Sequence, residues 1–166
     1  KRNYGWPEDA KFLVPDGVYD HFANGVGARS KAARGKWEAM LARYAKEFPD
    51  LAEQQTRMQI RELPDGWDKN LPAFPPDAKG VSGREASGQV LNALAQNYPW
   101  LVGGSADLSP STLTRLTFDG AGELERDESG RNLHFGIREH AMAAAMNGMS
   151  LSKIRAYGSG FFVFSD

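Results

Sequence analysis

A proline-rich stretch, residues 63–80, sets the strongest limit on how this chain can fold. It reads LPDGWDKNLPAFPPDAKG and holds four prolines and two glycines in 18 residues. Proline lacks the backbone N–H that helices and inner strands need, and glycine favours turns, so no regular element is expected there. We therefore predict a linker that divides the chain, with residues 1–72 as one part and residues 73–166 as the other.

The first part is predicted to be irregular at its start and helical afterwards. Residues 1–30 are rich in Gly, Pro and Asp with scattered aromatic residues, which indicates a packed but irregular connector. Apolar residues then recur at spacings of four, three and four, which predicts one helix that Pro49 closes. The residues with these spacings are Trp37, Leu41, Tyr44 and Phe48. A weaker helix is expected from about Leu51 to Leu63.

The second part alternates between helical and strand-like patterns. Ser82 or Ser87 is placed to cap a first helix, and WLVGGSADL (100–108) has the apolar run of a buried parallel strand that feeds a loop. A polar excursion (117–132) is expected at the surface. GIREHAMAAAMNG (136–148) predicts a second helix, and IRAYGSGFFVFS (154–165) predicts a strand, a glycine turn and an aromatic element. This alternation predicts an α/β domain with a parallel sheet.

Composition excludes several classes of function. Twenty basic and twenty-one acidic residues give a net charge of −1, so no basic surface for nucleic acid is indicated. No apolar run approaches the roughly 20 residues that span a bilayer. The absence of cysteine excludes disulfides, thiolate metal sites and a cysteine nucleophile, and it fits a reducing compartment. We expect a cytoplasmic protein with neither nucleic acid nor a membrane as partner. Because the sequence lacks an initiator methionine and stops within an aromatic run, we also expect an internal piece of a longer protein.

Several residues are candidates for function, each beside a structural interpretation. Glu139 begins the second predicted helix, where a carboxylate can serve chemistry or can cap the helix dipole and pair with an arginine. The loop GGSADLSPST (103–112) follows the first strand, where ligands bind in parallel sheets, but its Ser and Asp side chains can also satisfy their own backbone. Arg84, at a helix start, suits a phosphate group or solvent. His134 and His140 do not have the spacing of a metal pair.

Three stretches, taken in order, resemble the transketolase family: LVGGSADLSPSTLTR, HFGIREHAMAAAMNGMS and YGSGFFVFSD. This family uses thiamine diphosphate to move two-carbon ketol units between sugar phosphates. The amino-terminal YGWPEDAKFLVPDGVYDHF is also similar to the family, and the likeness is weakest across residues 24–80. The resemblance implies a partial three-layer, parallel-sheet domain of the thiamine-diphosphate-binding fold after a largely helical or irregular connector. Residues 1–72 would end the diphosphate-binding domain and include the linker, and residues 73–166 would form the first half of the pyrimidine-binding domain.

The resemblance also implies roles for residues near the cofactor. Glu139 matches the catalytic glutamate that hydrogen-bonds N1′ of the aminopyrimidine and so activates the cofactor. That contact calls for an apolar surrounding, which the Ala and Met residues of the same helix are expected to supply. Asp107 and Leu108 match a loop beside the cofactor. Phe161 and Phe164 match aromatic residues near the pyrimidine ring, with Phe164 the stronger match. The sequence departs from the family just before them, because Gly158-Ser159-Gly160 stands where the family more often has Gly-Gly-Thr.

Substrate and partner assignments follow from the same resemblance. Arg84 and Ser111 match residues that hold the phosphate of a sugar phosphate substrate. The cofactor's diphosphate and a divalent metal (Mg or Ca) would be held by a separate domain, whose Gly-Asp-Gly…Asn motif this sequence lacks. The family site lies between the subunits of a homodimer and serves the pentose phosphate pathway, so this chain alone is expected to be inactive. Dihydroxyacetone synthase is one alternative. A non-catalytic module from a split gene, which needs a partner chain, is another.

Overall fold

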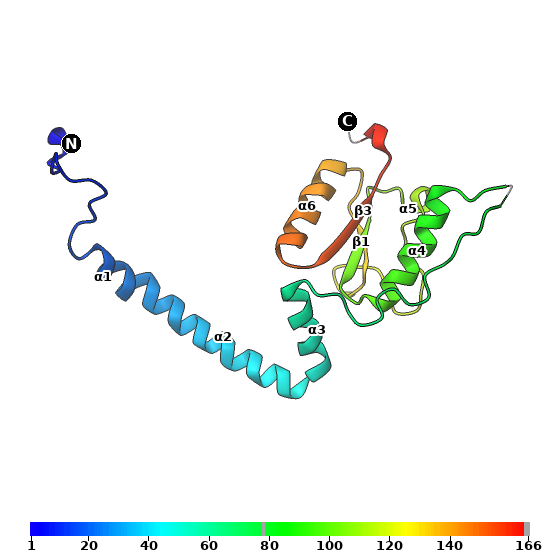
Figure 1. The fold of residues 1–166 in the computed structure, drawn as a ribbon, viewed down its shortest axis with the longest axis horizontal. Coiled ribbons are helices and arrows are strands. Elements are labelled where there is room, and N and C mark those ends of the chain that lie inside the picture. Colours follow the sequence, from blue (N-terminus) through cyan, green and yellow to red (C-terminus); the bar gives the residue numbers. More distant parts are fainter. Residues whose placement is uncertain (78, 165–166) are drawn as a thin grey trace. The chain divides into compact units, whose positions relative to one another are not determined.

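The computed structural model describes residues 1–77 and 79–164, and it divides into two compact units, Lys1–Ala52 and Glu53–Asp166 (Figure 1). The predicted division after residue 72 concerns the family's domains and stays a prediction. No described helix is both long and apolar enough to cross a membrane.

The first unit is helical over much of its length. A short 3-10 turn, η1 (Arg2–Tyr4), is followed by α1 (Val18–Phe22), the π-helical turn η2 (Ala23–Gly27) and α2 (Ala28–Glu47). The expectation of an irregular connector up to residue 30 is therefore wrong from Val18 onwards. Gly25 and Gly27 lie inside the wider π turn, which keeps the helix continuous through a stretch that composition assigned to the irregular connector. The connector is not packed either, because residues 1–30 are all exposed or half-buried.

The predicted helix with the aromatic stripe is confirmed as α2. Its end is also as expected: α2 stops at Glu47, and Pro49 then opens α3 (Pro49–Ile60). Proline suits the first position of a helix because no partner is needed there for its missing N–H. Residues 61–82 form no helix or strand where the structure describes them, in agreement with the predicted linker.

The second unit is an α/β domain, as predicted. Its elements after α3 are α4 (Gly83–Asn97), β1 (Leu101–Ser105), α5 (Ser109–Thr112), β2 (Asn132–His134), α6 (Glu139–Leu151), β3 (Arg155–Ser159) and the 3-10 turn η3 (Phe162–Phe164). The three strands are parallel and lie in the order β2-β1-β3. Ser82, not Ser87, is the cap of α4: its side chain accepts from the Glu85 N–H, and the Glu85 carboxylate accepts from the Ser82 N–H.

Helices cover both faces of this sheet. On one face, Tyr157 packs with Leu91 and Leu94 of α4 against the buried core. On the other, Gly158 lies under α6: a methyl group there would come within 2.5 Å of the Met146 sulfur. Tyr157 and Gly158 point to opposite faces because side chains alternate along a strand. Figure 1 shows the resulting order of layers, with α4 and α6 on opposite sides of β1 and β3.

Gly103 and Gly104 have a different role from the one expected. They were placed in a loop where they would admit a ligand, but both are buried within β1. A methyl group at Gly103 would strike the Tyr157 carbonyl of β3, and one at Gly104 would strike the Leu133 carbonyl of β2. The two glycines therefore let the neighbouring strands approach β1, and the loop itself starts only after Ser105.

The excursion between α5 and β2 is anchored by buried polar contacts, although its polar sequence indicates a surface loop. Asn132, only 4% exposed, receives a hydrogen bond from the Leu116 N–H and donates to the carbonyls of Leu116 and Gly122. Arg131 donates to the carbonyls of Ala95, Tyr98 and Leu101. Both ends of the excursion are thus fastened into the domain by side chains that look like surface residues in the sequence.

Candidate functional site

The loops that follow the three strands meet at one edge of the sheet. All three strands are parallel, so their carboxyl ends lie together, and β1 is central. The Ala106 N–H donates to the Ser159 carbonyl at 3.3 Å, and the Phe135 N–H is 3.4 Å from the Ser105 carbonyl. Through these two bonds, the residue after β1 is held to the end of β3 and the residue after β2 to the end of β1. This edge is where ligands bind in open parallel sheets.

Glu139 reaches this edge from the first position of α6. It is half-buried, and its Cγ atom is 3.5 Å from the position that a Cβ of Gly160 would occupy. The side chain therefore passes alongside the loop that leads to Phe161. Salt bridges found in the described part of the chain do not include Glu139, so the alternative of an arginine partner has no support there. The amino-terminal end of α6 favours a carboxylate at this position.

Asp107 and Leu108 form the turn directly after β1. The Leu108 N–H donates to the Ser105 hydroxyl at 2.9 Å, which also lies 2.9 Å from the Ser109 hydroxyl. The serines thus satisfy the loop itself, which was one of the two interpretations. Asp107 instead is exposed and has a φ of 62°, a left-handed conformation that a non-glycine residue adopts at some energetic cost. The structural interpretation is confirmed for Ser105 and Ser109, and a ligand role for Asp107 stays a prediction.

The two residues predicted for phosphate lie beside each other. Arg84, in the first turn of α4, directs Nη1 toward the Ser111 carbonyl of α5 at 3.4 Å. Both residues are exposed. The guanidinium group has five donors in all, so further donors remain for an anion next to the Ser111 hydroxyl.

Phe161 and Phe164 also lie together, with ring centroids 6.3 Å apart in an edge-to-face arrangement. They are 37% and 55% exposed, so the described chain does not bury them as core residues. They present aromatic surface next to the loop that contacts Glu139.

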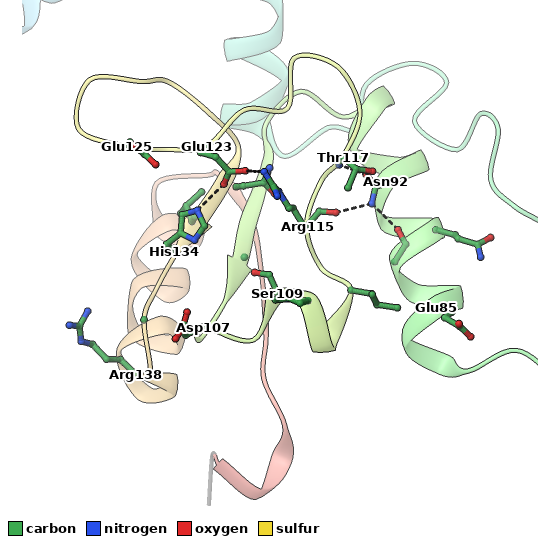
Figure 2. A pocket seen from close by; sticks show the side chains of 18 residues that line it. Glu85, Asn92, Asp107, Ser109, Arg115, Thr117, Glu123, Glu125, His134 and Arg138 are labelled. Carbon is green, nitrogen blue, oxygen red and sulfur yellow. Dashed lines mark hydrogen bonds and ion pairs between the residues drawn. The ribbon is translucent and has the colours of Figure 1, made fainter.

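A pocket of about 1070 Å³ opens on the β2 side of this edge (Figure 2). Of the predicted site residues only Asp107 lines it, although neighbours of others do, namely Glu85, Pro110 and Arg138. Glu139, Arg84, Ser111 and the two phenylalanines are not part of its lining. The proposed cofactor and phosphate residues are thus grouped around the edge of the sheet and not within this one cavity.

Sequence reasoning missed an ionic cluster in the pocket wall. Arg115 and His134 both contact the Glu123 carboxylate, His134 through Nε2 at 2.8 Å (Figure 2). Burial raises the pKa of Glu123, but hydrogen bonds from His134 and Arg115 outweigh it and hold the pKa below its ordinary value. His134 had been considered only with His140. Its true partner is 11 residues away in the opposite direction, and no local spacing rule indicates it.

Metal ligation has no obvious location in the described residues. No group of three or more His, Asp or Glu side chains in residues 1–77 and 79–164 is arranged to hold an ion.

Comparison with known proteins gives matches along the whole chain. The family model "Transketolase, pyrimidine binding domain" matches residues 79–166, and "Transketolase, thiamine diphosphate binding domain" matches residues 1–64. The chain is 43% identical to the transketolase of Bacillus subtilis and 42% identical to that of Geobacillus stearothermophilus, covering 100% of this chain and 25% of each relative. It thus spans about a quarter of the length of these relatives.

Solved structures agree with this relationship. A transketolase from Leishmania mexicana has a TM-score of 0.84 at 34% identity, covering 99% of this chain and 24% of that one. A Pichia stipitis transketolase in complex with sedoheptulose-7-phosphate has a TM-score of 0.82 at 33% identity, covering 97% of this chain and 25% of that one. These names do not favour dihydroxyacetone synthase or a non-catalytic module. Because the pyrimidine-binding family model alone covers more than half of the residues, the chain belongs to the transketolase family.

Proposed function

We propose that this chain is the part of a transketolase that binds the aminopyrimidine of thiamine diphosphate and the phosphate of the sugar substrate. The observation that carries the proposal is the meeting of Glu139, Asp107 and the loop 160–164 at the carboxyl edge of the sheet. A carboxyl group beside exposed aromatic rings fits an aminopyrimidine, which offers a flat face and ring nitrogens. When bound, thiamine diphosphate supplies the carbanion chemistry of ketol transfer.

In this proposal the residues of the chain orient the cofactor and hold one proton. Glu139 hydrogen-bonds N1′ of the pyrimidine, and the start of α6 keeps its side chain directed at the edge of the sheet. Phe161 and Phe164 lie against the ring, and Asp107 and Leu108 line the loop beside it. The left-handed turn at Asp107 keeps that side chain exposed at the edge, where it can meet a ligand.

The phosphate of the substrate is assigned to Arg84 and Ser111. A guanidinium group matches the geometry of phosphate oxygens, and the helix start at α4 adds favourable polarity. Structures of relatives are described as complexes with sedoheptulose-7-phosphate and fructose-6-phosphate, which supports sugar phosphates as the substrates here. Ketol transfer between such sugars would place the enzyme in the pentose phosphate pathway of the cytoplasm.

A second subunit and a separate domain complete the site in this proposal. The diphosphate and its divalent metal are assigned to the diphosphate-binding domain. In this chain, residues 1–64 match the family model of that domain. A homodimer is supported by the outer face of α6, where Ala141, Ala144, Ala145 and Gly148 are exposed. Ile137 and Leu151 extend this apolar face and are 80% and 79% exposed.

Replacement of Glu139 tests the proposal. In the full-length transketolase that carries this segment, Glu139→Ala is expected to lower turnover by at least about 100-fold, the lower range for loss of a proton-holding group. The control is Asn147→Ala, an exposed position on the same helix, which should keep ordinary turnover. Near-normal ketol transfer by Glu139→Ala, measured with saturating thiamine diphosphate and metal, would contradict the role assigned to Glu139.

A further inference from the structure

One face of α4 runs alongside the segment that carries Ser111. Arg84, Gly88 and Asn92 are spaced four residues apart, so they lie above one another on the same face of the helix. Residues 111–117 pass along this face in the same order. Arg84 meets the Ser111 carbonyl at one end, and Asn92 meets Arg115 and Thr117 at the other.

Gly88 sets how closely the two segments approach. It is buried, and a Cβ atom there would lie 2.6 Å from the Leu113 carbonyl oxygen and 3.3 Å from the Leu113 Cβ. Leu113 itself is in a left-handed conformation with a φ of 56°, which costs a residue with a side chain some energy. Any larger residue at position 88 must push the segment away from α4, one turn below Arg84.

Asn92 sets the position of the segment along the helix. Its amide nitrogen donates to the Gly88 and Arg115 carbonyls at 3.0 Å each, and its amide oxygen accepts from the Thr117 N–H at 2.8 Å and the Thr117 hydroxyl at 3.3 Å. Four bonds use both donors and both lone pairs of the amide. Figure 2 shows this side chain reaching from α4 to the segment.

We propose that Gly88 and Asn92 are positioning residues that fix Ser111 relative to Arg84, and that they thereby set the preference of the enzyme for phosphorylated donors. The inference rests on the proposed function, because it assumes that Arg84 and Ser111 hold a phosphate. Neither positioning residue touches that phosphate. They act by keeping the Arg84 guanidinium and the Ser111 hydroxyl at the distance at which both can hydrogen-bond one phosphate. A misplacement of about 1 Å is enough to weaken such a site strongly.

The experiment compares two donors in the full-length transketolase: a ketose phosphate and the same ketose without its phosphate. The measured quantity is the ratio of kcat/KM for the first donor to kcat/KM for the second. Asn92→Leu, which keeps the size of the side chain but removes its bonds, is expected to lower this ratio about tenfold, through KM of the phosphorylated donor. Gly88→Ala is expected to lower it similarly. A merely structural defect would lower kcat/KM for both donor substrates by the same factor and leave the ratio unchanged.

Gln96→Leu is the matched control, because Gln96 lies one turn further on α4, is exposed, and donates to the Asn92 carbonyl within its own helix. It should keep the ratio. If Asn92→Leu does not fold, Asn92→Asp replaces it; the aspartate keeps the acceptor for Thr117 and gives up the two donated bonds, so the ratio should again fall.

The outcomes separate this inference from the proposed function. A lower ratio in the Asn92 and Gly88 variants, with Gln96→Leu unchanged, supports the positioning role. A lower ratio in Arg84→Ala but not in the Asn92 and Gly88 variants overturns the inference and leaves the phosphate site in place. An unchanged ratio in Arg84→Ala overturns the phosphate site, and the inference with it.

Discussion

Replacing Asn132 by alanine should destabilise the domain more than any ordinary polar substitution. Asn132 starts β2, and its side chain is buried between the strand and the excursion that precedes it. It accepts one bond at 2.8 Å from the Leu116 N–H and donates two, at 3.0 Å each, to the Leu116 and Gly122 carbonyls. Alanine removes all three bonds, and Leu116 is itself only 2% exposed, so water does not readily replace them.

The magnitude follows from these bonds. A net contribution of about 0.5–1.5 kcal/mol for each bond predicts a total loss of about 2–4 kcal/mol, with the buried Leu116 N–H left without its acceptor. For a chain of this size each kcal/mol lowers the melting temperature by roughly 2–4 °C, so the midpoint should fall by about 5–15 °C. Because Gly122 and Leu116 are released together, the excursion is expected to loosen along its whole length.

Urea unfolding of the chain, followed by tryptophan fluorescence, measures this loss, since Trp100 belongs to the buried core. Asn147→Ala, at an exposed position of α6, serves as the control and should stay within about 0.5 kcal/mol of the unchanged protein. A loss below about 0.5 kcal/mol for Asn132→Ala would refute the reasoning, because it would mean that the three bonds give no net stability.

Three further predictions concern the site and its surroundings. Arg84→Ala should raise KM for a phosphorylated donor at least about tenfold more than for an unphosphorylated ketol, and equal effects would contradict a phosphate role. Ala145→Arg places a charge on the exposed face of α6 and should shift the full-length enzyme from dimer to monomer in sedimentation; an unchanged dimer would exclude this face from the interface. Burial raises the pKa of Tyr157 to about 12, above the roughly 10 of an unfolded tyrosine, so the folded state holds this proton more tightly and stability should fall as the pH rises from about 10 to about 12. An ultraviolet titration should show a late tyrosine that disappears in Tyr157→Phe, and a late step that remains would refute it.

Local patterns predicted several elements of both units well. The aromatic stripe before Pro49 is a helix, and the apolar run at Leu101 is a buried strand. Ser82 followed three residues later by Glu85 is a capping box in the structure, as residues of these types at this spacing often are. In each of these places the residues that determine the element lie within one or two turns of one another, so a short window of sequence contains the whole cause.

The errors arise where the cause lies far away in the sequence or where one residue type has two uses. Residues 1–30 indicated an irregular connector, but Gly25 and Gly27 lie within a helical turn. Gly103 and Gly104 indicated a ligand loop, but they let the neighbouring strands approach β1. Glycine marks a close approach of strands at Gly103 and Gly104 but not at Gly25, where an added Cβ would meet nothing within 4 Å, so only the fold decides which use a glycine has.

Polar residues with distant partners were the hardest to interpret. Asn132 reads as a surface residue because its partner Leu116 is 16 positions away, and Asn92 likewise meets Thr117 at a separation of 25. No local pattern around either asparagine indicates its distant partner. The same holds for the contact of His134 with Glu123, because the spacing rules for metal ligands do not indicate a pair of this kind.

The location of the candidate site and its internal geometry have different causes. Its location follows from topology: once three strands are parallel and β1 is central, the residues after each strand must meet at one edge, whatever the length of the excursion between them. Its internal geometry does not follow from topology, because Ser111 is on a four-residue helix whose place depends on Gly88 and Asn92. The residues that we propose to bind the ligands were therefore found through the family motifs. The residues that we propose to adjust the distance between Arg84 and Ser111 became visible only through their contacts in the structure. Variation in donor preference among related enzymes should accordingly be sought on the inner face of α4 as well as among the residues that touch the phosphate.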